Sequence, residues 1–183
     1  MPLMKRFLFH FLLFSQIGVI AQGAANYQIR TIAFYNLENL FDTKRDTLIF
    51  DQDRTPTGKD HWTEERYLEK IAKMSKVISE IGSTENKTAP DIIGVCEVEN
   101  LSVLQDLVLH NNLLQTNYGI IHFDSPDERG IDVALLYKKD AFIPVNFNSH
   151  RLLLFDIDGK RNYTRDQLIV EGLLDNEKIY FLV

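Results

Sequence analysis

The chain has 183 residues, 45% of them hydrophobic and 11% aromatic, so it can build one domain with a sizeable core and is not of the disordered class. Its 26 Asp and Glu outnumber its 20 Lys and Arg, which leaves a net charge of −6. This balance argues against a protein that coats nucleic acid through bulk electrostatics, although a local group of Arg side chains can still hold a phosphate.

The amino-terminal residues have the pattern of an export signal. Two basic residues precede the apolar run 7–14, and residues 19–21 have the spacing that a signal peptidase recognises. We expect residues 1–21 to be a signal peptide cleaved after Ala21, and the domain to cover residues 27–183. A membrane anchor is the alternative, but polar residues interrupt a stretch that would need roughly 20 apolar residues. The expected protein is exported, periplasmic or secreted, without a stable membrane anchor.

The first predicted strand covers residues 29–36, a β-rich apolar run that breaks at a polar segment. Asn36 closes this strand, and Glu38 follows two residues later. Residues 42–60 are charged and contain Pro and Gly, which predicts a long surface loop with Trp62 packed at its far end.

Two helices are expected, one directly after this loop and one further along the chain. Thr63 can cap a helix over residues 64–81, which has two glutamates in its first turn and apolar residues at steps of four and three. The charged residues of this helix, among them Lys70, are predicted to form its solvated side. Residues 101–110 predict a shorter helix, and residues 83–90 a turn.

The stretch 91–100, DIIGVCEVEN, predicts a strand buried on both faces, because residues 92–96 are all apolar or small. Strand alternation places Glu97 and Glu99 on one face and Val98 on the other. Glu97 then emerges at the carboxyl end of a core strand, where α/β proteins bind ligands. A lone acid at that position is more often only a solvated strand end.

Strands dominate after residue 115. They are expected over residues 118–123, 131–137, 142–147, 152–155, 167–173 and 179–183. Asp158-Gly159 is typical of a hairpin turn. Early helices followed by strands in series favour an α+β sandwich rather than alternating βαβ units. The sequence stops inside an apolar strand, from which we expect a fragment of a longer protein.

Four motifs, FYNLENLFD, DIIGVCEVEN, DERGIDVALLY and TRDQLIVEG, resemble in order and spacing the amino-terminal half of the endonuclease/exonuclease/phosphatase superfamily. The similarity covers about residues 29–183 and is greatest to secreted bacterial members. It implies an α+β fold of the DNase I type, a four-layer α/β/β/α sandwich whose carboxy-terminal half is missing from this chain.

The resemblance also implies a site. Glu97 takes the place of the family's metal-binding Glu, Asn36 that of an Asn contacting metal or phosphate, and Glu38 that of an auxiliary acid. Arg129 and Arg165 resemble positions near the substrate phosphate, although each has acidic neighbours and could instead form a surface ion pair. The candidate catalytic residues are therefore Asn36, Arg129 and Arg165, and the candidate metal ligands Glu97, Asn36 and Glu38.

Carboxylate and amide oxygens suit a hard cation, so Mg²⁺ is expected, with Mn²⁺ or Ca²⁺ as alternatives. The family's later His, Gly-Asp-x-Asn and Ser-Asp-His motifs do not occur in this sequence. We expect the full-length parent to be a monomeric, metal-dependent phosphoesterase that hydrolyses a phosphodiester or phosphomonoester, in nucleic acid or in a phosphorylated small molecule or lipid. The chain as given is expected to be inactive.

Two other interpretations stay open at this point. A non-catalytic exported binding module would keep the sandwich fold without its chemistry. A glycosidase would use Glu97 and Glu99 as paired carboxylates, but retaining chemistry needs carboxyl groups about 5 Å apart across a sugar, and these two share one face of a strand.

Overall fold

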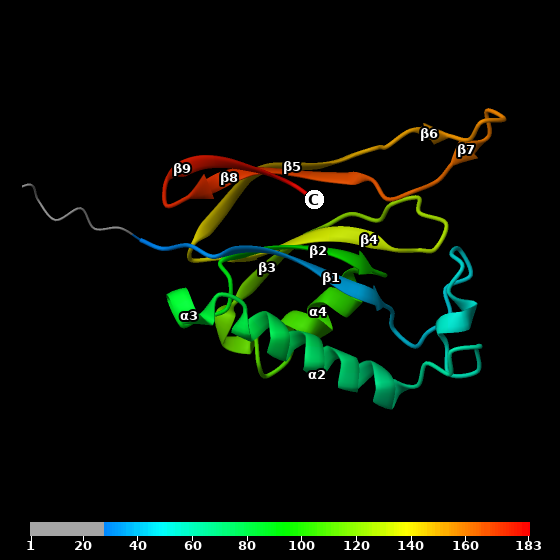
Figure 1. Ribbon diagram of the computed structural model, residues 1–183, viewed down its shortest axis with the longest axis horizontal. Helices are drawn as coiled ribbons and strands as arrows, with labels where there is room; N and C mark the ends of the chain where they lie inside the picture. The colour runs from blue at the N-terminus through cyan, green and yellow to red at the C-terminus, as the bar shows by residue number, and fades with distance from the viewer. Residues whose placement is uncertain (1–27) are drawn as a thin grey trace, which may run out of the picture.

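The computed structural model describes residues 28–183, and the predicted signal peptide, residues 1–21, lies outside them. Two β-sheets pack face to face, and helices cover the outer face of the first sheet (Figure 1). The sandwich-like α+β architecture expected from the sequence is confirmed. Within the described range, no helix combines the length and apolar character needed to cross a membrane.

The elements follow the predicted order closely. They are β1 (Ile32–Leu40), the 3₁₀ helix η1 (Gln52–Arg54), α2 (Glu64–Glu80), α3 (Ser83–Asn86), β2 (Ile92–Val98), α4 (Leu101–Leu109), the 3₁₀ helix η2 (Leu114–Thr116), β3 (Tyr118–His122), β4 (Asp132–Lys138), β5 (Phe142–His150), β6 (Leu154–Phe155), β7 (Arg161–Asn162), β8 (Gln167–Leu174) and β9 (Glu177–Leu182). The sequence missed the short elements α3 and β7, because segments of two to four residues show no hydrophobic period.

The first sheet has the strand order β1-β2-β4-β3. β1 and β2 are parallel with α2 between them in sequence, so this part is a βαβ unit that the sequence analysis did not anticipate. β4 pairs antiparallel to β2 on its other side. Because neighbours surround β2 on both edges and both faces, its apolar residues are buried as predicted.

The helices α2 and α4 begin at side-chain caps. The Thr63 hydroxyl accepts a hydrogen bond from Arg66 N, and the Asn100 side chain accepts one from Val103 N at 3.0 Å. Gly82, with φ 71°, follows the end of α2 in the left-handed region. The buried apolar stripe of α2 consists of Tyr67, Ile71, Met74 and Ile78. The helices therefore form where the caps and the period predict them.

The second sheet, β5-β8-β9, packs over the other face of the first sheet (Figure 1). Phe142 is 1% exposed and packs edge-on against Tyr137 and Phe181, with ring centroids 5.6 Å away in each case. β6 and β7 form a separate hairpin, and Gly159 in its turn has φ 77°. The hairpin predicted from Asp158-Gly159 is present.

The fourth layer of the expected sandwich does not occur within residues 28–183, because no helix in that range lies over the second sheet (Figure 1). Several apolar side chains of β5 and β9 are exposed: Ile143, Val145, Phe147, Tyr180 and Leu182. The described residues thus form three layers, one of helices and two of strands.

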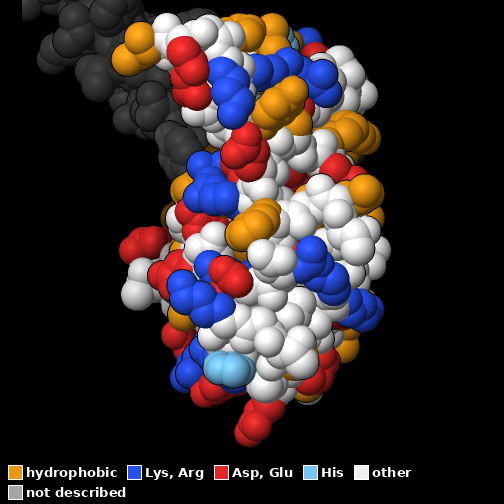
Figure 2. Space-filling view, turned by 90° about the vertical axis from the view of Figure 1, so that its right-hand side faces the viewer, with side chains coloured by type: hydrophobic (Ala, Val, Ile, Leu, Met, Phe, Trp, Pro, Cys, Tyr) orange, Lys and Arg blue, Asp and Glu red, His pale blue; other side chains and the backbone are white. Residues whose placement is uncertain are grey.

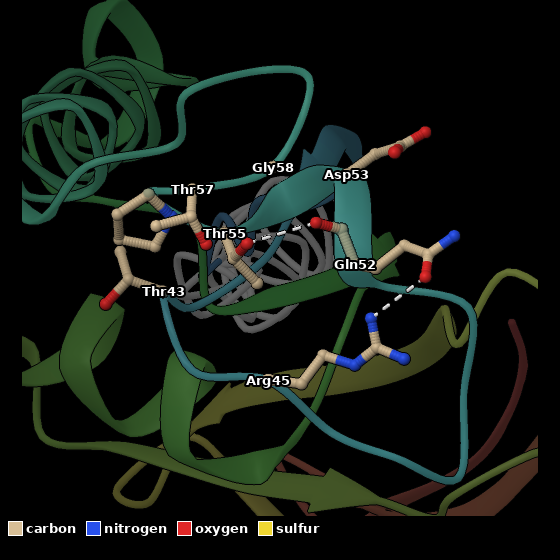
Figure 3. A pocket seen from close by; sticks show the side chains of 8 residues that line it. Thr43, Arg45, Gln52, Asp53, Thr55, Thr57 and Gly58 are labelled. Carbon is tan, nitrogen blue, oxygen red and sulfur yellow. Dashed lines mark hydrogen bonds between the residues drawn. The ribbon is translucent and has the colours of Figure 1, made fainter.

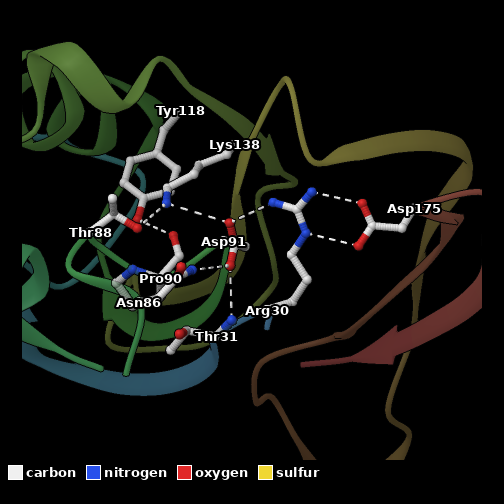
Figure 4. Close-up of polar contacts among 9 residues, drawn as sticks. All are labelled: Arg30, Thr31, Asn86, Thr88, Pro90, Asp91, Tyr118, Lys138 and Asp175. Carbon is white, nitrogen blue, oxygen red and sulfur yellow. Dashed lines mark hydrogen bonds and ion pairs between the residues drawn. The ribbon is translucent and has the colours of Figure 1, made fainter. Parts of the chain in front are cut away.

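A buried acid joins separate parts of the chain at the amino ends of β1 and β2 (Figure 4). Asp91 is 1% exposed and accepts a hydrogen bond from Thr31 N at 2.8 Å. It also pairs with Arg30 at 3.2 Å and Lys138 at 3.4 Å. Arg30 reaches across to Asp175, in the turn between β8 and β9, at 2.7 Å. The cluster therefore links the two sheets.

Candidate metal and phosphate site

Asn36 and Glu97 lie at the carboxyl ends of neighbouring parallel strands. Asn36 is in register with Cys96, the residue before Glu97, so both candidate ligands leave the first sheet at the same edge. Asn36 is exposed and Glu97 is partly exposed. Neither side chain is turned into the packed interior, and both can meet a ligand from solvent.

Both strands depart from regular geometry at this edge. Glu97 has φ 60°, and Glu38 and Asn39 have φ 52° and 57°, all in the left-handed region that non-glycine residues seldom adopt. The β1–β2 ladder also shifts register here, and the extra residues lie on β1. Bulges and strained residues of this kind re-aim side chains and cluster at functional sites.

The bend at Glu97 overturns the alternation expected for β2. Val98 packs beneath the helices with Ile93 and Val95, in the row that the sequence assigned to Glu97. A residue in the left-handed region interrupts the two-residue period, so Val98 and not Glu97 takes the next core-facing position of β2. The Glu97 side chain is thereby freed from the hydrophobic core.

The Asn36 amide is oriented by its own backbone. Asn36 Oδ1 accepts a hydrogen bond from Glu38 N at 2.6 Å. A carbonyl oxygen has two acceptor positions, so one remains for a cation or a bound water. Within residues 28–183, no side chain or backbone group hydrogen-bonds to the carboxylates of Glu38 or Glu97, so all their oxygen positions are open to a ligand.

A lysine of α2 holds the bent end of β1. Lys70 Nζ donates hydrogen bonds to the carbonyl oxygens of Glu38, at 2.5 Å, and Asn39, at 3.3 Å. It also lies 5.7 Å from the centre of the Trp62 ring. Burial lowers the pKa of the Lys70 ammonium, while the charges of Glu38 and Glu97 oppose that effect. The prediction that Lys70 belongs to the solvated side of α2 is wrong.

Glu99 is in a different environment from Glu97. It is 7% exposed, and its carboxylate accepts a hydrogen bond from Asp42 N at 2.7 Å. Burial raises the pKa of Glu99 to about 8, although the hydrogen bond from Asp42 works in the other direction. The buried Glu99 side chain therefore stabilises the start of the 42–60 loop through its hydrogen bond with Asp42 N.

The two candidate phosphate arginines differ in their partners. Arg129 is exposed and pairs with Asp127, Nε to Oδ1 at 3.3 Å, so the ion pair considered as its alternative role is present. Arg165 has no ion pair among residues 28–183. Burial raises the pKa of the Cys96 thiol and the Arg165 charge opposes it, which indicates that this guanidinium lies near the end of β2.

An open pocket of about 530 Å³ lies within the 42–60 loop and contains none of the candidate residues (Figure 3). Some of its polar groups are engaged within the loop itself: Arg45 donates to Gln52 Oε1 at 3.2 Å, and Thr55 Oγ1 donates to the Gln52 carbonyl at 3.0 Å. A smaller pocket of about 250 Å³ is lined by Asn39 and Arg129, among others, and so adjoins the candidate site.

One group of metal-ligating residue types was not anticipated from the sequence. His122, Asp124 and Asp132 bring ligand atoms within 4.8 Å of one another, which makes them a possible metal site. Asp132 Oδ2 lies 2.9 Å from His122 Nε2, and Asp132 Oδ1 accepts from Ser125 Oγ at 2.6 Å. Both Asp132 oxygens are thus engaged by the protein. The pairing of β3 with β4 in an antiparallel hairpin is the signal that would have brought these residues together.

The side-chain oxygens at the ends of β1 and β2 are of the type that a hard divalent cation prefers. Glu97 and Glu38 supply unengaged carboxylates and Asn36 an amide oxygen. Mg²⁺ is usually held by one or two carboxylates and keeps several waters, so a set of this size is sufficient. Side chains on rigid strand ends also need little reorganisation to bind it.

Comparison with known proteins identifies the family of the chain. A sequence model described as the Endonuclease/Exonuclease/phosphatase family matches residues 31–183. No curated protein matches the chain. The matched residues include all five candidate site residues.

Solved structures with a similar fold share little sequence with the chain. Humanized D. rerio TDP2 is 12% identical over 84% of this chain and 45% of that chain, with a TM-score of 0.47. The mannosyl-6-phosphatase of Bacteroides thetaiotaomicron is 18% identical over 84% and 50%, with a TM-score of 0.46. An endonuclease/exonuclease/phosphatase from Bacteroides vulgatus is 16% identical over 82% and 48%, with a TM-score of 0.44. The chain spans about half the length of these structures.

The family model covers most of the chain, including the strands that carry Asn36 and Glu97. Proteins of this family are phosphoesterases. The chain belongs to the endonuclease/exonuclease/phosphatase family.

Proposed function

We propose that the full-length protein hydrolyses a phosphodiester or phosphomonoester with the help of a divalent cation. The observation that carries this proposal is the register of β1 against β2. With Asn36 opposite Cys96, the amide of Asn36 and the carboxylate of Glu97 leave neighbouring strands at one edge. A rigid pair of this kind can hold one cation.

In this proposal Glu97 and Asn36 bind Mg²⁺ directly, Glu38 contributes as an auxiliary ligand, and Mn²⁺ or Ca²⁺ can replace Mg²⁺. The bound cation supplies charge stabilisation to the phosphoryl oxygens. Arg129 and Arg165 orient the phosphate group, since the guanidinium fork matches its oxygen geometry. We further propose an exported monomer without a stable membrane anchor.

The geometry argues against the glycosidase interpretation. Glu99 is buried and bonded to Asp42 N, while Glu97 is freed from the core by its left-handed backbone. The two carboxyl groups therefore do not flank a common sugar site, as paired carboxylates must.

Replacement of one ligand tests the proposal. Glu97→Gln preserves the shape of the side chain and removes its charge, so hydrolysis of p-nitrophenyl phosphate and bis(p-nitrophenyl) phosphate in Mg²⁺ should fall by about 100-fold, or about 3 kcal/mol. EDTA should abolish activity in the wild-type protein, and added Mg²⁺ should restore it. Both assays use the full-length protein.

Glu80→Gln is the matched control, because Glu80 is an exposed residue at the end of α2. It should leave activity unchanged. Wild-type rates in Glu97→Gln would contradict the assignment of Glu97. A folded full-length protein that binds neither Mg²⁺ nor Mn²⁺ in calorimetry would instead indicate an exported binding module.

A further inference from the structure

A small pocket next to the proposed metal site carries several cationic side chains. It has a volume of about 250 Å³ and is lined by Asn39, Phe41, Phe50, Asp53, Arg54, Lys59, Asp60 and Arg129. Three cations and two acids line it, and Asp127, which pairs with Arg129, brings the acids to three. Lys59 has no ion pair among the described residues, so its charge beside two guanidinium groups is available to an anionic ligand.

Two separate segments of the chain build this pocket and are fastened together. One wall comes from the 42–60 loop and the other from the turn that ends at Gly130. The Ile49 side chain packs so closely on Gly130 that a Cβ there would lie 2.3 Å from Ile49 Cδ1. The base of the loop is closed by Trp62, whose Nε1 donates to the Phe41 carbonyl at 2.9 Å. The pocket therefore has a fixed frame.

Two of the three cations are oriented before any ligand arrives. Arg54 pairs with Asp60 at 3.1 Å and lies 5.6 Å from the centre of the Phe41 ring. Arg129 is held by Asp127, with its backbone N–H and its Nε both donating to Oδ1 of that residue. Guanidinium groups fixed in this way recognise phosphate with little entropic cost.

Lys59 completes the set. It is exposed and forms no ion pair within residues 28–183. Its ammonium group is a mobile point charge, which complements the two fixed guanidinium forks. Lys59 is therefore the residue whose change should disturb binding with the least effect on the fold.

The size of the pocket limits what it can bind. At about 250 Å³ it lies below the roughly 300–1,000 Å³ of sites for drug-sized ligands. Figure 2 shows Lys and Arg side chains interspersed with acidic and hydrophobic ones over this end of the molecule, rather than a continuous basic track. A compact phosphate group fits these limits better than a length of nucleic acid backbone.

We propose that this pocket binds a second, non-reacting phosphate group of the substrate, so that the preferred substrate carries two phosphates. The proposal rests on the proposed phosphoesterase function for the reacting phosphate. Asn39 lines the pocket and follows Glu38 directly, so a phosphate held by Arg54 and Lys59 lies beside the proposed metal ligands and beside Arg129, which orients the reacting phosphate in the proposed function. Binding energy from a remote phosphate would then position the reacting one.

The first test measures binding without catalysis. Pyrophosphate is titrated into the full-length protein by calorimetry, in EDTA and at low ionic strength, where the pocket should bind it with a Kd of about 1 mM or tighter. Lys59→Glu and Arg54→Gln should each weaken this binding by about 10-fold. Lys76→Glu, at an exposed position on α2, makes the same charge change as Lys59→Glu and should have no effect.

Two results of this titration would overturn the proposal. One is the absence of pyrophosphate binding to the wild-type protein. The other is an equal loss in Lys59→Glu and Lys76→Glu, which would assign the binding to overall charge. Thermal unfolding of Arg54→Gln checks that the 42–60 loop stays folded. If this variant is unfolded, the pyrophosphate affinity of Lys59→Glu alone tests the proposal.

The second test asks whether the bound phosphate belongs to the substrate. In Mg²⁺, glucose 1,6-bisphosphate should be hydrolysed with about 10-fold higher kcat/KM than glucose 6-phosphate, and Lys59→Glu should remove the preference. Equal values in the wild type would show that the pocket holds only free phosphate and would refute the proposal. If neither sugar phosphate nor any chromogenic ester is cleaved while pyrophosphate still binds, the proposed function fails and the anion pocket stands.

Discussion

At the scale of single residues, one side chain from α2 contacts the bent end of β1 beside the candidate site. Lys70 bonds two consecutive carbonyls, those of Glu38 and Asn39, whose residues both have left-handed backbone. Such conformations cost of the order of 1–3 kcal/mol each and persist only where the surroundings impose them. Lys70 is a positioning residue, since it acts on the proposed ligands through the backbone.

Lys70→Met should therefore weaken Mg²⁺ binding in calorimetry by about 10-fold, as is typical when an outer partner of a metal ligand is lost. Met has a similar length and no charge, so the two backbone hydrogen bonds and the cation–π contact with Trp62 are lost together, and thermal unfolding checks that the fold survives. Lys70→Arg, which can still donate, should recover part of the affinity. Lys73→Met, at an exposed position one turn further along α2, is the control. Unaltered Mg²⁺ affinity in Lys70→Met would refute this role.

At the scale of elements, the 42–60 loop is fastened to the turn before β4 by the contact between Ile49 and Gly130. Gly130 has φ 65°, and Gly159, in the β6–β7 turn, has φ 77°. A Cβ at Gly130 would meet Ile49, whereas nothing lies within 4 Å of a Cβ at Gly159. The two glycines share the backbone conformation and differ in packing.

This difference gives a matched pair of variants. Gly159→Ala should cost about 1 kcal/mol of unfolding free energy, from backbone strain alone. Gly130→Ala should cost about 3 kcal/mol, because Ile49 must also move. Urea unfolding monitored by circular dichroism measures both. Similar losses in the two variants would show that the loop does not depend on this contact.

At the scale of the whole molecule, the two sheets are joined by an apolar interface and by the charged cluster around Asp91. The interface is centred on Phe142, and the cluster runs from Lys138 and Asp91 through Arg30 to Asp175. Loss of Asp91 would leave the Lys138 ammonium without its counter-ion and the Thr31 N–H without its acceptor, whereas Arg30 would keep Asp175; burial makes the loss at Lys138 costly.

Asp91→Ala should lower the free energy of unfolding by about 3–5 kcal/mol, as is usual when one partner of a buried ion pair is removed. Calorimetric unfolding should show a much smaller loss for Asp175→Ala, because Asp175 is exposed at the far end of the same chain of contacts. If Asp175→Ala lowered the free energy of unfolding as much as Asp91→Ala, the ion pair between the sheets would contribute more to stability than the burial of Asp91.

The sequence by itself determined the elements and the candidate ligands. The period and caps of α2, the apolar run of β2 and the Asp158-Gly159 turn depend on residues close together in the chain, so local patterns report them. The motifs around Asn36 and Glu97 likewise identified the family that the comparison later matched.

Only the tertiary structure decided how those residues are presented. The left-handed backbone of Glu97 breaks the strand period. The hydrogen bonds of Lys70 to β1 and the contact of Ile49 with Gly130 join positions far apart in sequence. Alternation assumes regular backbone, and a helical wheel assigns a long charged side chain to solvent even where it can reach a backbone carbonyl of a neighbouring strand. Contacts of that kind are set by packing between elements, which no local window of sequence contains.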